Sequence, residues 1–475
     1  SDYEKIVQYL SRRDIPRLRW VFSAALKRGV RLERLLTLLQ RAADGIYRAH
    51  GHDKFLLDVS FLASELGGPR LLFALGRSHG LLSKRTIRRR LNVPRVLVSI
   101  ALPTKDEIDT NISSLLDPDV APLPVPLSPS TALPGHIAMF DGVALEPKAC
   151  YCGRRDCVIG LSRETASRVD TSASEMENID LIRIALHEKR VKFGTEATVL
   201  AIASYADDTH YTPIPLVASP SDKSEKADTL AQWLGTTLEC WKAHDNGERT
   251  RGPIWSLGSD GDSTYRLAKH TLCSKGRLGG ALRDKLSRLH GFNLRSSADG
   301  QTTWTCDPKH IIKRFATLLR NRQGIIVSDS NITPHDILFH LTSLGSLSPE
   351  QAVQLLDPAD KQNVPKAVSL MQYLHELGPR AKAAGSTAGL DPVQIRSRNA
   401  LLAFSRILWY FVEPFINVHM SLSEQLESLA AFVHCANILQ IRHGSAALTG
   451  ALFADTGATV KNIFTVVARL QLLNP

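Results

Sequence analysis

The sequence has 475 residues, of which 43% are hydrophobic and 22% charged, so it is long enough to bury the cores of two or three globular domains. No apolar run reaches the length of a transmembrane helix and the first residues lack a secretory pattern, so we expect neither a membrane protein nor an exported one. The net charge of +11 favours a polyanionic partner such as nucleic acid, although many basic proteins have none. Seven cysteines without a secretory signal indicate reduced thiols in a cytosolic or nuclear protein. Because the chain begins at Ser1 and not at Met, we expect a fragment or a processed protein.

Residues 1–100 are predicted to form a helical domain, because apolar residues recur at helical spacing through most of this stretch. Gly67-Gly68-Pro69 is expected to end one helix, and Ser83 is expected to cap a short later one. That later helix is basic, with cationic side chains at Lys84, Arg85, Arg88, Arg89 and Arg90. A helix, a turn containing Gly and an Arg-rich helix resemble a helix-turn-helix that contacts DNA phosphates. The alternative is a basic helix face that meets only solvent.

Residues 101–135 are predicted to be a linker between domains. The run Ala121–Pro129 has a proline at every second or third position. Proline lacks the backbone donor and clashes with the preceding helical turn, so this run cannot propagate a helix. We therefore place the clearest domain boundary here.

The stretch His136–Leu145 reads HIAMFDGVAL and predicts a strand whose single acid, Asp141, follows an apolar run. An ionised carboxylate is costly to bury without a partner, so this position favours a functional site. The alternative is that Asp141-Gly142 forms the turn of a hairpin. A second predicted strand, 254–258, leads in a similar way to Asp260. Two strand-end carboxylates far apart in sequence are typical of a site that binds divalent metal ions.

The downstream pattern changes from strands to helices. Asp262 precedes a helix that is expected to begin near Thr264, so it is either a helix cap or part of the site. Asp307, followed by Pro308, predicts another helix start, with His310 and Lys313 on one face of that helix. After Asn321 the chain is predicted to be helical to its end.

Asp141, the stretch 259–262 and the stretch 307–314 together resemble a transposase of the P-element kind. This family includes THAP-domain transposases and transposon-derived fungal proteins, and the fungal members are the most similar. Four further stretches carry the resemblance: LASELGGPRLLFALGRSHGLLSKRTI (62–87), the segment from Leu356 to Leu370, WYFVEPFINVHMSLSEQLESL (409–429) and VKNIF (460–464). The resemblance therefore covers nearly the whole chain, and the order and spacing of the motifs make it specific.

The resemblance implies an α/β fold with a ribonuclease H-like mixed sheet at 136–320. The helical N-terminal domain and the linker precede this sheet, a helical insertion occupies 321–395, and C-terminal helices occupy 396–475. In such transposases one catalytic acid lies on the first strand, one at the end of the fourth, and one on a late helix. Asp141 matches the first acid and Asp260 the second. The resemblance implies that both are catalytic and that both hold Mg²⁺ or Mn²⁺, provided that the site is complete.

The same resemblance implies a supporting or phosphate-contacting role, without metal ligation, for Asp262, Asp307, His310 and Lys313. In fungal relatives the third acid lies beyond the VKNIF stretch, and this chain stops at Pro475 before any such motif. We therefore expect the C-terminal helices to be cut short of that acid. Glu413, Glu424 and Glu427 match non-catalytic positions of the family. The family's P element binds guanine nucleotide through its insertion, but this sequence has no Gly-x-x-x-x-Gly-Lys loop.

Three functions remain open at this point. The first is a nuclear, transposase-like enzyme whose ancestral reaction is metal-dependent DNA strand cleavage and transfer, with DNA as partner and homo-oligomerisation left open. The second is an inert, domesticated relative that binds DNA or another protein on the same scaffold. The third is a helical interaction protein in which the acids are only caps and turns, and this function predicts that Asp141 and Asp260 lie far apart.

Overall fold

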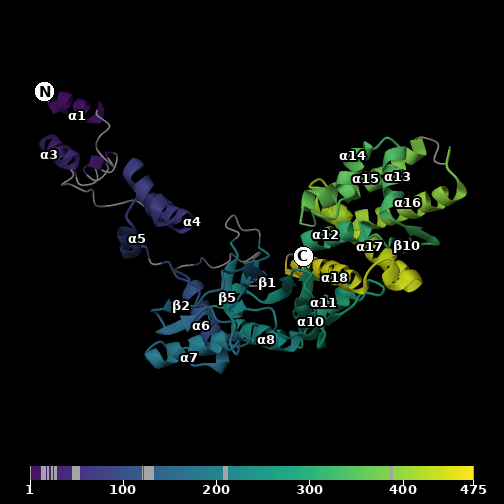
Figure 1. Ribbon diagram of the computed structural model, residues 1–475, viewed down its shortest axis with the longest axis horizontal. Coiled ribbons are helices and arrows are strands. Elements are labelled where there is room, and N and C mark those ends of the chain that lie inside the picture. Colours follow the sequence, from purple (N-terminus) through teal and green to yellow (C-terminus); the bar gives the residue numbers. More distant parts are fainter. Residues whose placement is uncertain are drawn as a thin grey trace. The chain divides into compact units, whose positions relative to one another are not determined.

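The computed structural model describes residues 2–11, 18, 21–22, 25, 29–44, 54–91, 93–119, 121, 133–206, 212–360, 362–383 and 389–473 (Figure 1). The chain divides into two compact units, Ser1–Pro94 and Arg95–Pro475, and each is described by itself. Within the described ranges, no helix combines the length and the apolar character that a membrane crossing requires.

The first unit is helical over its described residues. Its helices are α1 (Asp2–Ser11), α3 (Leu32–Ala43), α4 (Lys54–Ser78) and α5 (Lys84–Arg90). α4 kinks at Gly68, whose φ of 70° suits glycine, and Pro69 follows directly, so the predicted break is confirmed as a kink. The predicted cap of α5 is also confirmed, because the Thr86 backbone N–H donates to the Ser83 hydroxyl at 3.3 Å. Ile87 anchors α5 in the core of this unit.

The second unit is built around a five-stranded mixed sheet, as expected. Its strands lie in the order β5-β4-β1-β6-β9. β1 pairs antiparallel with β4, and β4 antiparallel with β5, whereas β1–β6 and β6–β9 are parallel pairs. The strands run over β1 (His136–Ala144), β4 (Glu196–Ser204), β5 (Ile214–Ser221), β6 (Ile254–Ser259) and β9 (Thr303–Cys306). The strands predicted at 136–145 and 254–258 are therefore confirmed.

Three helices pack against one face of this sheet: α6 (Lys105–Leu115), α8 (Ala227–Ala243) and α10 (Ser263–Leu272). Their apolar side chains share a core with Ala138 and Phe140 of β1 and with Leu257 of β6. α6 lies inside the stretch that was predicted to be a linker, so that prediction is wrong over 105–115. Thr104 and Glu107 form a capping box at its start, and Ile108 and Ile112 are fully buried.

The last helix, α18 (Gly450–Leu473), covers β9 and β6 on the sheet. Hydrogen bonds fix the register of this contact. The hydroxyls of Ser256 and Thr303 both donate to Asn462 Oδ1, at 2.7 and 2.6 Å, and the Cys306 backbone N–H donates to Thr459 Oγ1 at 3.1 Å. Because these groups are buried, each bond removes an unsatisfied polar atom from the interface between helix and sheet.

Smaller elements surround the sheet. They are the hairpin β2 (Cys150–Cys152) and β3 (Cys157–Ile159), η1 (Ala166–Arg168), α7 (Met176–His187), α9 (Glu248–Arg251), the pair β7 (Gly276–Arg277) and β8 (Arg295–Ser296), and α11 (Gly280–Leu286). α11 packs on α18 through Leu278, Leu282, Leu286 and Ala468.

The rest of the second unit is mainly helical (Figure 1). Its elements are α12 (Pro308–Leu319), α13 (Pro334–Ser343), α14 (Pro349–Leu356), α15 (Val364–Ala383), α16 (Pro392–Val412), η2 (Glu413–Phe415), α17 (Leu422–His443) and η3 (Gly444–Ala446). A core centred on Phe315, Phe404, Phe411 and Phe432 joins them. The expectation of helices alone after Asn321 is wrong at one place, because β10 (Ile325–Val327) and β11 (Ser330–Ile332) form a short hairpin. Ser328 turns this hairpin at a φ of 51°.

Candidate functional site at the carboxyl ends of three strands

Asp141 lies on β1, and Asp260 directly follows β6, the parallel neighbour of β1. Met139 of β1 pairs with Gly258 of β6. The pairing of β1 with β6 ends there, two residues before Asp141 in the one segment and two residues before Asp260 in the other. Because the two strands are parallel, both acids lie toward the same end of the sheet, just beyond the paired part of β1 and β6. A purely helical interaction protein does not fit this arrangement, because both acids adjoin strands of a mixed sheet.

Asp141 is not a turn residue. β1 continues through Asp141 and Gly142 to Ala144, and Asp141 pairs with Val199 of β4. Its side chain is exposed, and its Oδ1 accepts from the Gly142 backbone N–H at 2.8 Å. The alternative of a hairpin turn at Asp141-Gly142 is wrong, because β1 stays paired with β4 through Ala144, and its pairing with β4 and β6 makes it the central strand of the sheet.

Asp260 is the first residue after β6 and is half-buried. Its Oδ1 accepts from the Asp262 backbone N–H at 3.0 Å, which closes a tight turn before α10. Asp262 then caps α10 by accepting from the backbone N–H groups of Thr264 and Tyr265, at 2.7 and 3.2 Å. The predicted capping role of Asp262 is confirmed, and its carboxylate is partly committed to that role.

The two acids fit part of the ligand set of a magnesium ion. Mg²⁺ takes one or two carboxylates and completes its octahedron with water and substrate phosphates. Neither Asp141 nor Asp260 forms an ion pair with any residue that the structure describes, so both keep carboxylate oxygen available. Over the same residues, no group of three or more His, Cys, Asp or Glu side chains is arranged to hold a metal ion.

Asp307 follows the end of β9, beside the end of β6. Its backbone N–H donates to the Ser259 carbonyl at 2.9 Å, which extends the sheet pairing by one residue. Its side chain caps α12, with Pro308 at the first helical position, as predicted. Its Oδ2 lies 2.7 Å from His310 Nδ1, and Lys313 Nζ donates to Gln362 Oε1 at 2.8 Å. Both side chains are thus held in place near the strand ends.

The sequence analysis missed a buried acid, Asp455 on α18. Its side chain is 1% exposed and accepts from Arg266 Nε and Nη2, at 2.7 and 2.8 Å, and from Arg314 Nη1. The hydrogen bond to Asp455 is the main reason that the pKa of Arg266 lies above its ordinary value. One acid thus bridges arginines from α10 and α12. The available signal was that Asp455 is the single acid of this long helix.

This network also holds the loop that contains Asp260. Arg266 Nη2 donates to the Gly261 carbonyl at 2.6 Å, between Asp260 and Asp262. A side-chain Cβ added at Gly261 would lie 3.0 Å from Arg314 Nη1, so glycine lets that arginine pack against the loop. Asp455, through its two arginines, therefore fixes the backbone that presents Asp260.

A cavity of about 190 Å³ opens beside Asp260. Its lining contains two ion pairs. Lys223 Nζ lies 2.7 Å from Glu196, and Arg163 pairs with Glu225 at 2.7 Å. The hydrogen bond to Glu196 is the main reason that the pKa of Lys223 lies above its ordinary value, and burial raises the pKa of Tyr265 to about 12. The other lining residues are Gly142, Ser221, Asp262 and Thr264.

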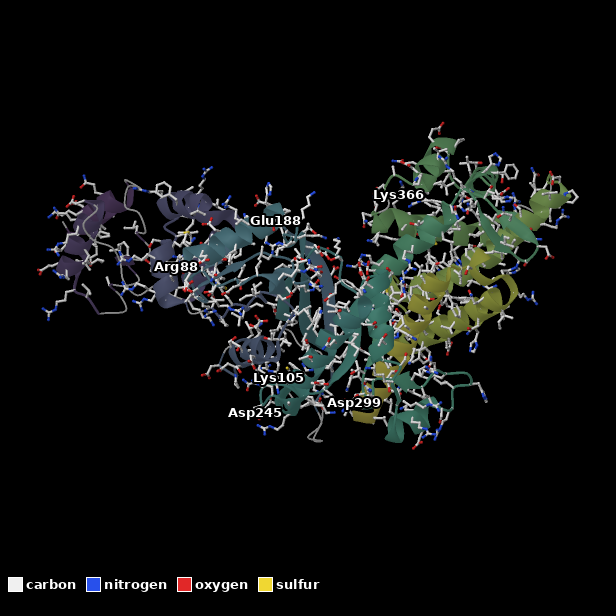
Figure 2. All side chains as sticks on the ribbon, turned by 60° about the horizontal axis from the view of Figure 1, so that its bottom comes forward. Arg88, Lys105, Glu188, Asp245, Asp299 and Lys366 are labelled. Atoms are coloured by element: carbon white, nitrogen blue, oxygen red, sulfur yellow. The ribbon has the colours of Figure 1, made fainter. Side chains whose placement is uncertain are left out.

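The predicted nucleic-acid contact on α5 lies in the first unit. The side chains of Lys84, Arg85, Arg88, Arg89 and Arg90 are all exposed (Figure 2 labels Arg88). None of the five forms an ion pair with a described residue, whereas Ile87 faces inward. These features suit both a phosphate-binding helix and a basic face that meets only solvent.

The fold of this chain, a mixed sheet continued by a helical C-terminal region, recurs in a solved transposase structure. A chain of the "Drosophila P element transposase strand transfer complex" matches with a TM-score of 0.54 and 12% sequence identity, over 92% of this chain and 84% of that chain. At this identity the likeness shows a shared fold. No protein-family model and no curated protein matches the sequence.

Proposed function

We propose that this chain is a transposase-like protein that cleaves and transfers DNA strands with the help of magnesium or manganese. The observation that carries the proposal is the position of Asp141 on β1 and of Asp260 directly after β6, the parallel neighbour of β1. The fold shared with a transposase of a strand transfer complex supports a DNA substrate, and the net charge of +11 agrees with it. A DNA substrate also favours a nuclear location.

The sheet topology supports a ribonuclease H-like assignment. In chain order the strands of the sheet are β1, β4, β5, β6 and β9, so β6 is the fourth of them. Asp141 lies on the first strand and Asp260 directly after the fourth. The resemblance to P-element-type transposases implies this same placement of the first two acids.

The proposed chemistry uses the side chains at this edge of the sheet. A bound magnesium ion supplies activation of water or of a 3′-hydroxyl and stabilisation of the leaving oxygen of a phosphodiester. Asp141 and Asp260 would hold that ion, and Asp455 would keep the loop of Asp260 in place through Arg266 and Arg314. Lys313 and His310 would meet the phosphates that flank the reacting bond.

The test of this proposal is nicking of supercoiled plasmid DNA by the whole chain. We expect nicked product with Mg²⁺ or Mn²⁺ and none with EDTA, because both carboxylates act through the metal ion. Nicking that survives EDTA would contradict the proposal. Binding of the same plasmid without nicking under any of these conditions would also contradict it and would favour the second candidate below.

The second candidate function is an inert DNA- or protein-binding relative. Two observations favour it: the described residues hold no three-ligand cluster, and both oxygens of Asp455 are engaged by arginines. Such a protein would bind its partner with the same surfaces but would not need Asp141 or Asp260.

Neutralising the basic helix tests the proposed DNA contact in the first unit. In the variant Arg88→Ala, Arg89→Ala, Arg90→Ala we expect the slope of log affinity against log salt to become shallower by about 2.7, since each lost phosphate contact removes about 0.9. Fluorescence anisotropy with a labelled duplex measures this slope. The control is Arg31→Ala, Arg34→Ala, Arg41→Ala, which removes the same charge from exposed positions on and beside α3. Equal slopes for both variants would mean that α5 is only a solvated surface.

A further inference from the structure

A second basic surface lies in the segment 275–295, between α10 and β9. The segment contains six cationic residues and a single acid, Asp284. Five of the cationic side chains are exposed and the sixth, Lys285, is half-buried. The full set is Lys275, Arg277, Arg283, Lys285, Arg288 and Arg295. None of them forms an ion pair with a residue in the described ranges, whereas nearby arginines such as Arg249 and Arg266 do.

The backbone of this segment brings two like charges together. Arg277 of β7 and Arg295 of β8 are direct partners across the antiparallel pair. Like charges directly opposite each other in a sheet are destabilising, so this arrangement does not serve the fold. The positive charge of Arg295 also affects Lys461 of α18, which donates to the Arg295 carbonyl. Burial together with this charge lowers the pKa of Lys461 to about 8. The positive charge is therefore concentrated and uncompensated.

The segment is packed firmly against the helix that carries Asp455. Leu278, Leu282 and Leu286 bury their side chains against Ala468 of α18, and Phe292 contacts Phe464 with ring centroids 6.2 Å apart. Such packing fixes the cations in space without using their charges. The exposed surface has little apolar area, since Leu289 is its single exposed large hydrophobic residue among the described side chains. A protein-binding core would need more aromatic and aliphatic area than this.

Distances along α18 relate the segment to the candidate site. Asp455 is linked to the loop of Asp260 through Arg266. Further along the helix, Lys461 contacts Arg295 and Ala468 contacts α11. With a rise of about 1.5 Å per residue, the basic segment extends from about 9 to about 20 Å from Asp455 along the helix axis. At about 3.4 Å per base pair, this span corresponds to the first half-turn of duplex beyond the acids.

We propose that the segment 275–295 binds the phosphates of the DNA duplex that flanks the reacting strand. The proposal rests on the proposed function for its substrate, but it concerns binding and not cleavage. Arg277, Arg283 and Arg288 would contact backbone phosphates without reading sequence. The repulsion between Arg277 and Arg295 is then relieved when DNA is bound, because phosphates lie against both side chains.

The experiment compares two triple variants of the whole chain by anisotropy with a labelled duplex, in EDTA so that no cleavage occurs. For Arg277→Ala, Arg283→Ala, Arg288→Ala we expect a salt slope shallower by about 2.7 and an affinity at least about tenfold weaker at 0.1 M salt. The matched control, Arg183→Ala, Arg190→Ala, Arg249→Ala, removes three arginines that are already paired with Asp180, Glu188 and Asp245. We expect this control to bind like the wild type.

A thermal-unfolding readout separates binding from folding. Because Arg277 faces Arg295, we expect the Tm of the basic-segment variant to be unchanged or slightly higher. Equal binding by both variants, or a binding loss that follows a lower Tm, would overturn the proposal. Weaker binding to polyglutamate with unchanged binding to the duplex would overturn it in favour of an acidic protein partner. If the salt slope falls as expected but plasmid nicking is absent in Mg²⁺, this proposal stands and the proposed cleavage fails.

Discussion

Replacing Asp260 by Asn is expected to reduce magnesium-dependent nicking by at least about 1000-fold, which corresponds to a loss of about 4 kcal/mol of transition-state stabilisation. Asparagine keeps the side-chain oxygen that accepts from the Asp262 backbone N–H, so the turn should survive. It loses the negative charge that a divalent ion requires. Asp141→Asn is expected to behave alike, since Asp141 is exposed on the strand beside β6 and has no cationic partner among the described residues.

The matched control for these variants is Asp262→Asn. Asparagine is as good a helix cap as aspartate, so the start of α10 should be unaffected. If Asp262 is only a cap, nicking should stay within a fewfold of the wild type. DNA affinity in EDTA should be similar in all three variants, since no carboxylate is removed from a DNA contact. Full nicking activity in Asp141→Asn or Asp260→Asn would refute their assignment as the metal-binding pair.

The parts of the site that could be predicted from sequence are those that local chemistry determines. Asp307 with Pro308, and Ser83 before the basic helix, are caps whose hydrogen bonds reach only two or three residues along the chain. The strand at 254–259 could be predicted as well, because Ile254, Trp255 and Leu257 precede a cluster of turn residues. That β1 and β6 are neighbours could not be derived from local patterns, since their register joins residues more than a hundred positions apart.

The failures have equally physical causes. Asp-Gly is a strong turn signal, but pairing of β1 with β4 outweighed it, and the strand continued through Gly142. The predicted linker 101–135 included α6 in error. The proline run that indicated a linker, Ala121–Pro129, begins only after α6 ends at Leu115. Asp455 could not be singled out, because its partners Arg266 and Arg314 are 189 and 141 residues away. The basic surface of the segment 275–295 was not predicted either, because leucines that are buried in the fold are interspersed with its arginines.

Asp455→Ala is expected to lower the free energy of unfolding by about 3 kcal/mol, which is the cost of breaking a buried ion pair by removing one partner. The guanidinium groups of Arg266 and Arg314 would remain largely buried without their counter-charge. Urea unfolding of the whole chain measures this loss. The control Glu427→Ala removes an exposed acid from α17 and should change stability by less than about 0.5 kcal/mol. Equal stability of Asp455→Ala and the wild type would show that the network contributes little.

A triple variant separates the stability of the network from its effect on Asp260. In Asp455→Leu, Arg266→Met, Arg314→Met the charges are replaced together by apolar groups of similar size, so most of the lost stability should return. The Gly261 carbonyl nevertheless loses the donor that Arg266 provides at 2.6 Å, and the loop that carries Asp260 is no longer fixed. Because a displacement of about 1 Å at a reacting group can cost about 100-fold in rate, we expect nicking to remain at least about 100-fold below the wild type. Recovery of both stability and nicking would mean that Asp455 only stabilises the fold, whereas recovery of stability alone assigns Asp455 to the positioning of Asp260.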